Sequence, residues 1–117
     1  MASEMTLSFG MSVTKSNLKY SNPPHSLILD LTGTRYLVNC QRVGTSDEAL
    51  VVGDLATAGY AWFKNLDPTN YVQIGLAASY TIRLKALQES LVPIDTLSLF
   101  AKANTAECLL QYVIFEA

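Results

Sequence analysis

Charged side chains are scarce in this sequence. Only 15% of its 117 residues are Asp, Glu, Lys or Arg, whereas 50% are hydrophobic; an ordinary soluble domain carries about 25% charged residues. The eight Lys and Arg residues are scattered singly and the net charge is −2. Phosphate binding needs concentrated positive charge, so we expect no nucleic-acid partner. The composition excludes a disordered chain and indicates that part of the surface does not face water.

Long apolar runs and targeting signals are also missing. No uninterrupted apolar run approaches the roughly 20 residues that span a bilayer. The opening MASEMTLSFG has neither the basic start nor the apolar centre of a signal peptide, and no basic tail would hold the chain on a membrane. We expect no membrane partner, and a chain that stays in the cytoplasm unless it leaves as part of an assembly.

Cysteine is too rare and too dispersed for a metal site or a disulfide framework. Cys40 and Cys108 are the only two cysteines, and neither has Cys or His neighbours at ligand spacing. Two reduced thiols are therefore expected. A disulfide between them stays open if their strands lie side by side.

The residue patterns of catalysis are missing as well. The one histidine, His25, follows a double proline and is interpreted as a solvated loop residue. There is no GxSxG elbow and no glycine-rich phosphate loop. Asp47-Glu48 has no third ligand at metal spacing, and nothing brings Asp30 and Asp54 together as a carboxylate pair. We predict no catalytic residue, no metal site and no cofactor, and therefore a protein that is not an enzyme.

What the sequence does have is apolar residues at a period of two. Short alternating segments recur at intervals of roughly ten residues, which is typical of an antiparallel sandwich or jelly roll. We predict an all-β chain of about eight to ten short strands forming one β-sandwich domain over residues 1–117. The last strand, 107–115, is apolar on both sides, as in a central strand packed on both faces. KALQES alone contains good helix formers and is compatible with a helical turn.

The segment 59–76 predicts a hairpin. Residues 59–66 and 71–76 are strand-like, and Asp67-Pro68-Thr69-Asn70 between them is typical of a turn. Asp67 would cap its own backbone and Pro68 would preset φ. The nearby aromatics Tyr60, Trp62, Phe63 and Tyr71 are mainly expected to pack in the core. A sugar-stacking platform or a protein contact remains open, with Tyr60 and Trp62 on one face of the strand and Phe63 on the other.

The N-terminal segment 1–14 is predicted to be a strand or arm, followed by an extended loop over 15–26. Its apolar positions alternate with Thr, Ser and Gly, so one face must be covered. It is either the first strand of the sandwich or an arm that completes a sheet on a neighbouring subunit. The candidate interface residues are Met5, Leu7, Phe9, Met11 and Val13.

Residues 59–116 resemble a group of small tailed-bacteriophage virion proteins. An aromatic strand there leads through an N-L-D-x-T-N-Y-V turn into a strand ending in Ile-Gly, and a late A-K-A-x-T-A segment precedes an apolar strand closed by Glu. Here these positions are Asn65, Leu66, Asp67, Thr69, Asn70, Tyr71, Val72, Ile74 and Gly75, then Ala101, Lys102, Ala103, Thr105, Ala106 and Glu116. Segment 31–50 is similar too. The chain departs from the pattern at Gln88-Glu89-Ser90, where a Gly-Glu pair is expected.

The resemblance implies a β-sandwich building block of a virion without catalytic residues. The first expectation is a capsid decoration, or cement, protein on the outer surface of the major capsid protein shell, assembled in the host cytoplasm. Self-association as a dimer or trimer is expected from the symmetry of such particles. The alternatives are a tail, neck or fibre-base component of the same virion, and a carbohydrate-binding module for host attachment.

Overall fold

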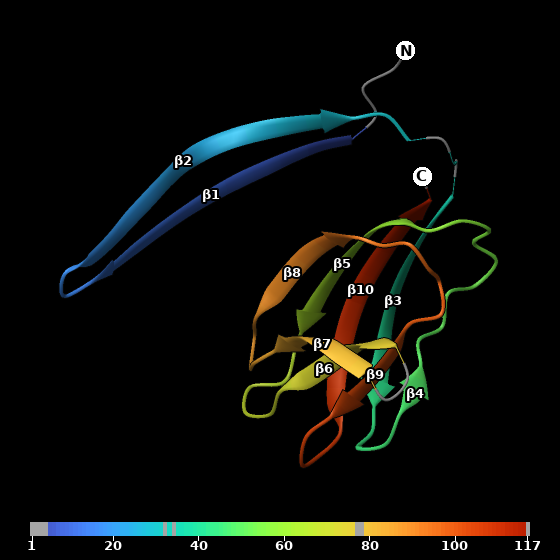
Figure 1. Ribbon diagram of the computed structural model, residues 1–117. Coiled ribbons are helices and arrows are strands. Elements are labelled where there is room, and N and C mark those ends of the chain that lie inside the picture. Colours follow the sequence, from blue (N-terminus) through green and yellow to red (C-terminus); the bar gives the residue numbers. More distant parts are fainter. Residues whose placement is uncertain (1–4, 32, 34, 77–78, 117) are drawn as a thin grey trace. The chain divides into compact units, whose positions relative to one another are not determined.

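The protein divides into two compact units. The computed structural model describes residues 5–31, 33, 35–76 and 79–116. Unit 1 covers Met1–Thr32 and unit 2 covers Gly33–Ala117, whereas the sequence predicted one sandwich domain over 1–117. The β-sandwich belongs to unit 2, and the N-terminal segment forms an antiparallel ribbon of its own (Figure 1).

Unit 1 is a two-stranded hairpin. β1 (Met5–Lys15) pairs antiparallel with β2 (Leu18–Leu29), and Ser16 and Asn17 connect them. Ser16 has a φ of 51°, the positive value typical of a two-residue hairpin turn. The predicted strand within 1–14 is confirmed as β1. The predicted loop over 15–26 is wrong, since β2 occupies most of it.

The double proline explains that error. Proline cannot donate a ladder hydrogen bond, which made 15–26 look like a loop. In the hairpin, Phe9 pairs with His25 and Met11 pairs with Asn22, so Pro23 and Pro24 lie at a register shift. An irregularity of this kind is where strands tolerate proline. The strand therefore continues past both prolines.

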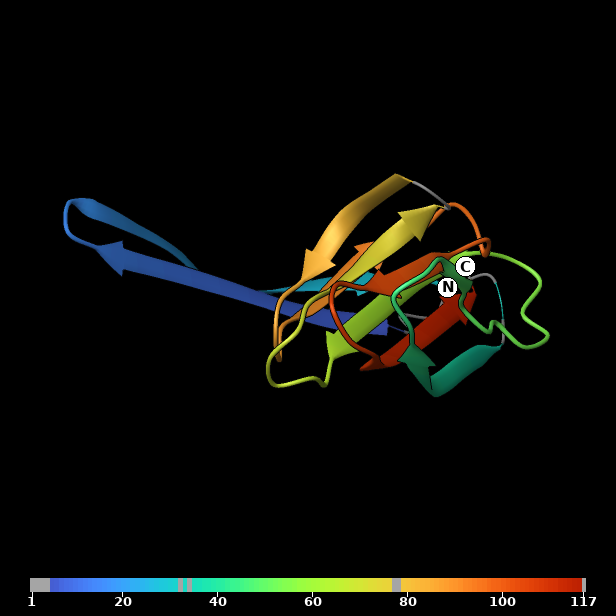
Figure 2. The same ribbon diagram turned by 90° about the horizontal axis from the view of Figure 1, so that it is seen from below.

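The described residues of unit 2 form eight strands in two four-stranded antiparallel sheets, and the two layers are seen in Figure 2. One sheet has the order β3-β10-β5-β8 and the other has the order β4-β9-β6-β7. Their bounds are β3 (Tyr36–Val43), β4 (Glu48–Ala49), β5 (Gly59–Asn65), β6 (Val72–Leu76), β7 (Ser79–Leu84), β8 (Glu89–Pro93), β9 (Phe100–Ala103) and β10 (Cys108–Glu116).

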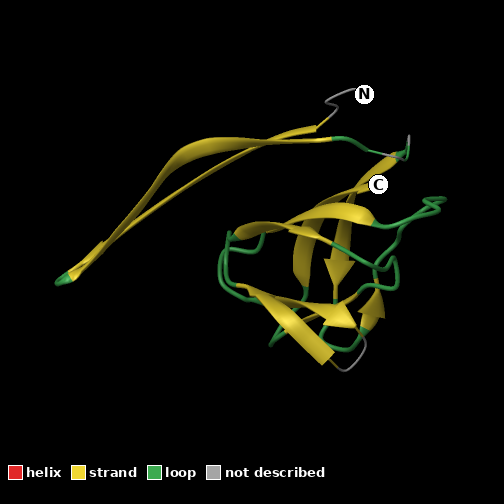
Figure 3. Ribbon diagram, turned by 45° about the horizontal axis from the view of Figure 1, so that its top comes forward, coloured by secondary structure: helices red, strands yellow, loops and turns green. Residues whose placement is uncertain are grey.

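The pairing is that of a jelly roll. β3 pairs with β10, β4 with β9, β5 with β8 and β6 with β7, so the chain forms one long antiparallel ribbon rolled into two sheets. With the hairpin, the described residues hold ten strands, and every element drawn in Figure 3 is a strand or a loop. The predicted all-β class and strand number are confirmed. KALQES forms a turn and the start of β8, with Leu87 at a φ of 62°.

The predicted hairpin over 59–76 is wrong. β5 pairs with β8 and β10, whereas β6 pairs with β7 and β9, so the chain crosses from one sheet to the other between them. The turn chemistry itself is as expected: Asp67 Oδ2 accepts hydrogen bonds from the Thr69 and Asn70 amides at 3.0 and 2.6 Å. A capped turn connects two strands equally well within one sheet or between two.

A buried asparagine holds this crossing in place. The Nδ2 of Asn65 donates to the carbonyl oxygens of Asn70, Leu84 and Lys85, and its Oδ1 accepts from the Asp67 amide. A fully buried amide side chain is tolerated only when its hydrogen bonds are made. Asn65 therefore joins the turn to the end of β7.

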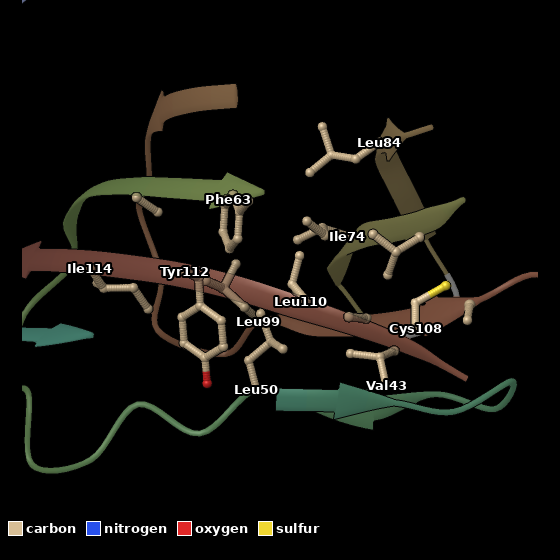
Figure 4. Close-up of a cluster of buried hydrophobic side chains, with 14 residues drawn as sticks. Val43, Leu50, Phe63, Ile74, Leu84, Leu99, Cys108, Leu110, Tyr112 and Ile114 are labelled. Atoms are coloured by element: carbon tan, nitrogen blue, oxygen red, sulfur yellow. The ribbon is translucent and has the colours of Figure 1, made fainter. Parts of the chain in front are cut away.

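The core lies between the two sheets and follows the period-two pattern. In β10, for example, Cys108, Leu110, Tyr112 and Ile114 are buried at every second position. Side chains from both sheets meet there (Figure 4). The buried set is Val43, Leu50, Ala61, Phe63, Val72, Ile74, Leu84, Leu99, Ala101, Ala103, Cys108, Leu110, Tyr112 and Ile114.

One polar network crosses the edge of this core. The Tyr112 hydroxyl donates to the Val51 carbonyl at 2.6 Å and accepts from Asn39 Nδ2 at 3.0 Å. Gln41 completes the network: its Nε2 donates to the Ala49 carbonyl and its Oε1 accepts from the Val51 amide. The network ties the centre of one sheet to the segment that follows β4.

Glu116 closes the last strand. Its side chain is buried, and its carboxylate accepts the backbone amides of Arg35 at 3.2 Å and Ala56 at 2.7 Å. Gly33 lies against it so closely that a Cβ at residue 33 would stand 2.2 Å from the Glu116 Cβ. The chain is thus anchored to β10 at residue 33, where unit 2 begins.

Candidate functional site

The first candidate surface is one face of the hairpin. Residues that pair directly across two strands point to the same side. Met5 pairs with Leu29, Leu7 with Leu27 and Val13 with Tyr20, while Phe9 and Met11 lie between them on β1. The polar residues His25 and Asn22, which pair with Phe9 and Met11, lie on this side too. We name the apolar residues of this side the hairpin face: Met5, Leu7, Phe9, Met11, Val13, Tyr20, Leu27 and Leu29. The opposite side is made mainly of Ser and Thr residues.

Most of the hairpin face is accessible to solvent. Met5 is buried and Leu7 half-buried, but Met11 is 55% and Tyr20 54% exposed. The sequence predicted that this face must be covered, and it correctly placed all five β1 residues on one side. The hairpin cannot cover this face itself, because a single layer of two strands has no second layer. The Phe9 ring contacts the ring of its cross-strand partner His25 on this face, with the ring centroids 5.9 Å apart.

The second candidate surface is the outer side of the β3-β10-β5-β8 sheet. One row across its four strands is Val38, Val113, Trp62 and Leu91, and the next is Tyr36, Phe115, Tyr60 and Pro93. All eight alternate with core residues and so point away from the core. We name these two rows the sheet face. Tyr36 is 65% and Val38 55% exposed, and the Tyr36 and Phe115 rings stack 5.8 Å apart.

The outer side of the other sheet is different in character. Its central row consists of Arg83, Gln73 and Lys102 on β7, β6 and β9. The Arg83 guanidinium lies over the Tyr71 ring, 4.4 Å from its centroid, and the Lys102 amine lies over the Tyr80 ring. The central row of this sheet therefore presents charged and amide groups outward, whereas the sheet face is aliphatic and aromatic and borders a polar row, Cys40, Gln111, Lys64 and Glu89, on its own sheet.

The aromatic residues divide as the alternation of β5 predicted. Phe63 is in the core, whereas Tyr60 and Trp62 are half-buried on the sheet face. Tyr71 lies outside the core set, beneath Arg83. The indole Nε1 of Trp62 donates to Glu89 Oε1 at 3.1 Å. Trp62 thus lies on the outer side of the sheet, in a row with Val113 and Leu91, with its indole hydrogen-bonded to Glu89.

A pocket of about 270 Å³ opens between the sheets, beside the core. Its wall is mostly apolar, including Phe63, Ile74, Ile82 and Leu99. Asp95 is the single titratable residue of the lining. One carboxylate cannot act as a general acid and base pair, so the pocket holds no arrangement that we can assign to catalysis.

The titratable residues singled out in the sequence are divided between the two units. Over the described ranges no group of three or more His, Cys, Asp or Glu side chains could hold a metal ion. His25 is exposed on the hairpin, and its Nδ1 lies 3.2 Å from the Pro23 carbonyl. Asp47 and Glu48 engage Tyr80 and the Gly44 amide respectively. Asp30 and Asp54 lie in different units.

The two cysteines are free. Their strands, β3 and β10, do lie side by side, but Cys108 pairs with Val43 while Cys40 pairs with Gln111. Cys108 points into the core and Cys40 points outward, so the disulfide left open by the sequence does not form. Burial raises the pKa of the Cys108 thiol, with a smaller contribution from the negative charge of Asp67.

The sheet face was missed by the sequence reasoning, although a signal for it existed. The alternate residues of β10 are apolar on both sides, as expected for a strand packed on both faces. β10 is indeed central in its sheet, between β3 and β5, but within unit 2 only its inner side is covered. The outer positions Val113 and Phe115 were the sign of a second contact surface.

No family model, no curated protein and no solved structure matches this chain. In the part of the chain that the structure describes, no helix is long and apolar enough to cross a membrane.

Proposed function

We propose that this protein is a non-enzymatic structural subunit of a tailed-bacteriophage virion, first of all a capsid decoration protein bound to the outer surface of the major capsid protein shell. One observation carries the proposal. The hairpin is a separate two-stranded sheet with a largely exposed apolar face. Such an element gains stability by binding another protein.

The physical argument starts from the weakness of an isolated hairpin. A single two-stranded ribbon is marginally stable in water, because it has no second layer to cover its apolar side. The hairpin face puts eight apolar residues on one side, of which Met11 is 55% exposed. Contiguous exposed apolar surface of this kind marks a protein contact. Binding a partner would both order the hairpin and attach the subunit.

The resemblance supplies the virion part of the proposal. The motif residues at 65–75 are structural in this chain: Asn65 and Asp67 organise the crossing between the sheets. Glu116, the last motif residue, ties the end of β10 to Arg35 and Ala56. Jelly rolls occur in viral capsid proteins and also in lectins, so the fold is compatible with the proposal without deciding it.

The two alternative functions, a tail or neck component and a carbohydrate-binding module, rest on different observations. A tail or neck ring component would use the same two apolar surfaces, and the same motif supports it. The carbohydrate-binding module depends on Trp62, whose indole is hydrogen-bonded to Glu89 within an apolar row. No observation favours that module over a protein contact.

Copy number in purified particles tests the proposal. Quantitative mass spectrometry against the major shell protein should give hundreds of copies per particle, since a decoration protein repeats with the shell. A small multiple of six would assign the protein to a tail or neck ring. Its absence from washed particles would reject the virion proposal altogether.

Point variants of the full chain test whether the hairpin face binds the particle. Met11→Glu puts a charge on the hairpin face, whereas Ser12→Glu puts the same charge on the opposite side of the same strand. We expect Met11→Glu to lose occupancy on particles and Ser12→Glu to keep it. Deleting the first thirteen residues is a poorer test, because it would leave β2 without its partner strand. Equal occupancy of the two variants would remove the hairpin from the proposal.

A further inference from the structure

We infer that the pocket between the two sheets of unit 2 binds a small apolar molecule that carries one ammonium group, such as an arylalkylamine. The apolar part would lie against the core, and the ammonium group would lie beside the carboxylate of Asp95. The pocket is lined from β5 and β8 of one sheet, from β6 and β7 of the other, and from the segment 94–99. The site lies within unit 2 alone and does not depend on the proposed virion role.

A register shift in the β6–β7 ladder opens the pocket. Ile82 and Leu84 on β7 pack in the core, so regular alternation would turn Tyr80 inward as well. The ladder instead shifts next to Gly75, and Tyr80 rather than Thr81 is paired with that glycine. A bulge of this kind re-aims the side chains beside it. The space that a tyrosine ring would fill between the sheets is therefore left open.

The tyrosine ring lies on the outer side of the sheet instead. The Lys102 amine, which belongs to the outward row of this sheet, lies over the Tyr80 ring, 5.3 Å from its centroid. At Gly75 a Cβ would stand 2.6 Å from the carbonyl oxygen of Ser79, so the two strands approach closely only because this residue is glycine. The small side chains of Ser79 and Thr81 then line the pocket where the tyrosine would have been.

The inner wall of the pocket is made of core side chains. Phe63 and Ile74, from opposite sheets, are fully buried, and Leu99 is nearly so. Ser79 and Thr81 are at exposed positions, so their hydroxyls belong to the mouth. An apolar wall with a few polar groups is typical of a small-molecule site. The wall therefore favours an apolar group over a strongly hydrated molecule such as a sugar.

The volume of the pocket limits the size of the ligand. That volume is about 270 Å³, whereas an apolar cavity of roughly 150 Å³ holds benzene. One aromatic ring with a short chain therefore fits the space. A drug-sized ligand or a peptide segment needs a larger pocket, since such sites extend from about 300 to 1,000 Å³.

Asp95 gives the pocket its selectivity for a cation. It is the single titratable residue of the lining, and within the described residues its carboxylate has neither an ion pair nor a hydrogen bond. The backbone on both sides of it is fixed: the Ile94 amide donates to the Gly59 carbonyl at 2.8 Å, and Thr96 Oγ1 accepts from the Ser98 amide at 3.0 Å. A fixed negative charge at an apolar site favours an ammonium group and disfavours a carboxylate.

Three probes that share one aromatic ring and a short chain test the inference. They are phenethylamine, which carries a cation, phenethyl alcohol, which is neutral, and hydrocinnamate, which carries an anion. Two-dimensional NMR titrations of the full chain measure their dissociation constants and locate them. We expect shifts at the lining residues Ile82 and Leu99, and roughly three- to fivefold tighter binding of the amine than of the alcohol. The difference is small because Asp95 is exposed and solvent screens the ion pair. Hydrocinnamate should bind most weakly.

Variants of the full chain separate the charge from the cavity. Asp95→Asn should remove the preference for the amine while the alcohol binds as before. The matched control is Asp54→Asn, which removes the same charge from unit 2 outside the lining and should keep the preference. Thr81→Phe puts a ring into the pocket and should abolish binding of all three probes. Should Thr81→Phe lower the melting temperature, Ser79→Phe replaces it.

Several outcomes would overturn the inference. Absence of shifts at the lining residues up to the solubility limit of phenethylamine shows that the pocket does not bind it. Equal binding of the three probes, or a preference for the amine that survives Asp95→Asn, rejects the role of the carboxylate. Binding that survives both ring substitutions places the probe elsewhere. Occupancy on particles measures the virion role separately, and none of these titration results changes it.

Discussion

Replacing Tyr112 by phenylalanine removes one oxygen atom from the edge of the core and nothing else. The ring is fully buried, 6.3 Å from the Phe63 ring, and a phenylalanine fills the same space. The change therefore tests the polar network without opening a cavity. It leaves the Val51 carbonyl and the Asn39 amide without the hydroxyl that each now bonds, and it removes the 3.1 Å contact of that hydroxyl with Gln41 Oε1, which keeps its bond from the Val51 amide.

The cost follows from those two lost partners. A buried polar group left without its hydrogen bond costs roughly 1–3 kcal/mol. Val51 is exposed and Asn39 half-buried, so water can replace part of each bond, and the lower half of that range applies to each. We expect Tyr112→Phe to lower the free energy of unfolding by about 2 kcal/mol. In a domain of this size the melting temperature would fall by roughly 8–16 °C.

Chemical denaturation of the full chain measures this effect, with Tyr36→Phe as the control. The Tyr36 side chain is 65% exposed, so losing its hydroxyl should change stability by less than about 0.5 kcal/mol. If Tyr112→Phe were as stable as Tyr36→Phe, the network would not hold the segment after β4. The reasoning about buried hydroxyls would then be wrong for this site.

High pH gives the same prediction an independent check. Burial raises the pKa of Tyr112 above its ordinary 10.0, against the smaller opposing effects of the bonds to Asn39 and Val51. The folded protein therefore keeps the proton at a pH where the unfolded chain loses it, and stability falls as pH rises above about 10. Tyr112→Phe lacks this titration. The stability difference between the two proteins should shrink above that pH, and a constant difference would contradict the assigned cause.

Two further predictions concern the turn and the thiols. Hydrogen bonds from the Asn70 amide and, to a smaller extent, the Thr69 amide lower the pKa of Asp67 below 3.8. The ionised carboxylate therefore stabilises the turn above about pH 3.8. This stabilisation is lost as the pH falls through the lower pKa of the folded state. Asp67→Asn should therefore be less stable at pH 7 by denaturation but differ little from the parent in strong acid; an equal deficit at both would refute the capping role. Of the two thiols, exposed Cys40 should react rapidly with a maleimide and buried Cys108 only on unfolding; mass spectrometry showing two adducts on the folded chain would contradict the burial of Cys108.

The period of the apolar residues was sufficient to predict the secondary structure class. Alternation placed Met5 to Val13 on one side of a strand, Phe63 opposite Trp62, and a central strand near the end of the chain. Each of these depends on local geometry, because successive side chains of any strand point to opposite sides. Capping by Asp67 was predictable for the same reason, since its partners are two and three residues away.

Pairing between distant segments is what local patterns could not supply. The same alternation and the same turn suit a hairpin or a crossing between sheets, so β5 and β6 were wrongly paired. The double proline hid β2, because its neighbours in the ladder are defined by β1 and not by its own sequence.

The two candidate surfaces differ in the same way in how far the sequence predicts them. The hairpin face was predictable because its β1 residues are consecutive alternate positions of one strand. The sheet face draws Tyr36, Trp62, Leu91 and Val113 from four strands, and their adjacency exists only once β3, β10, β5 and β8 are set side by side. The sequence by itself determined which way each side chain points along its strand. Only the tertiary structure decided which strands are neighbours, because that choice depends on contacts between residues far apart in the chain.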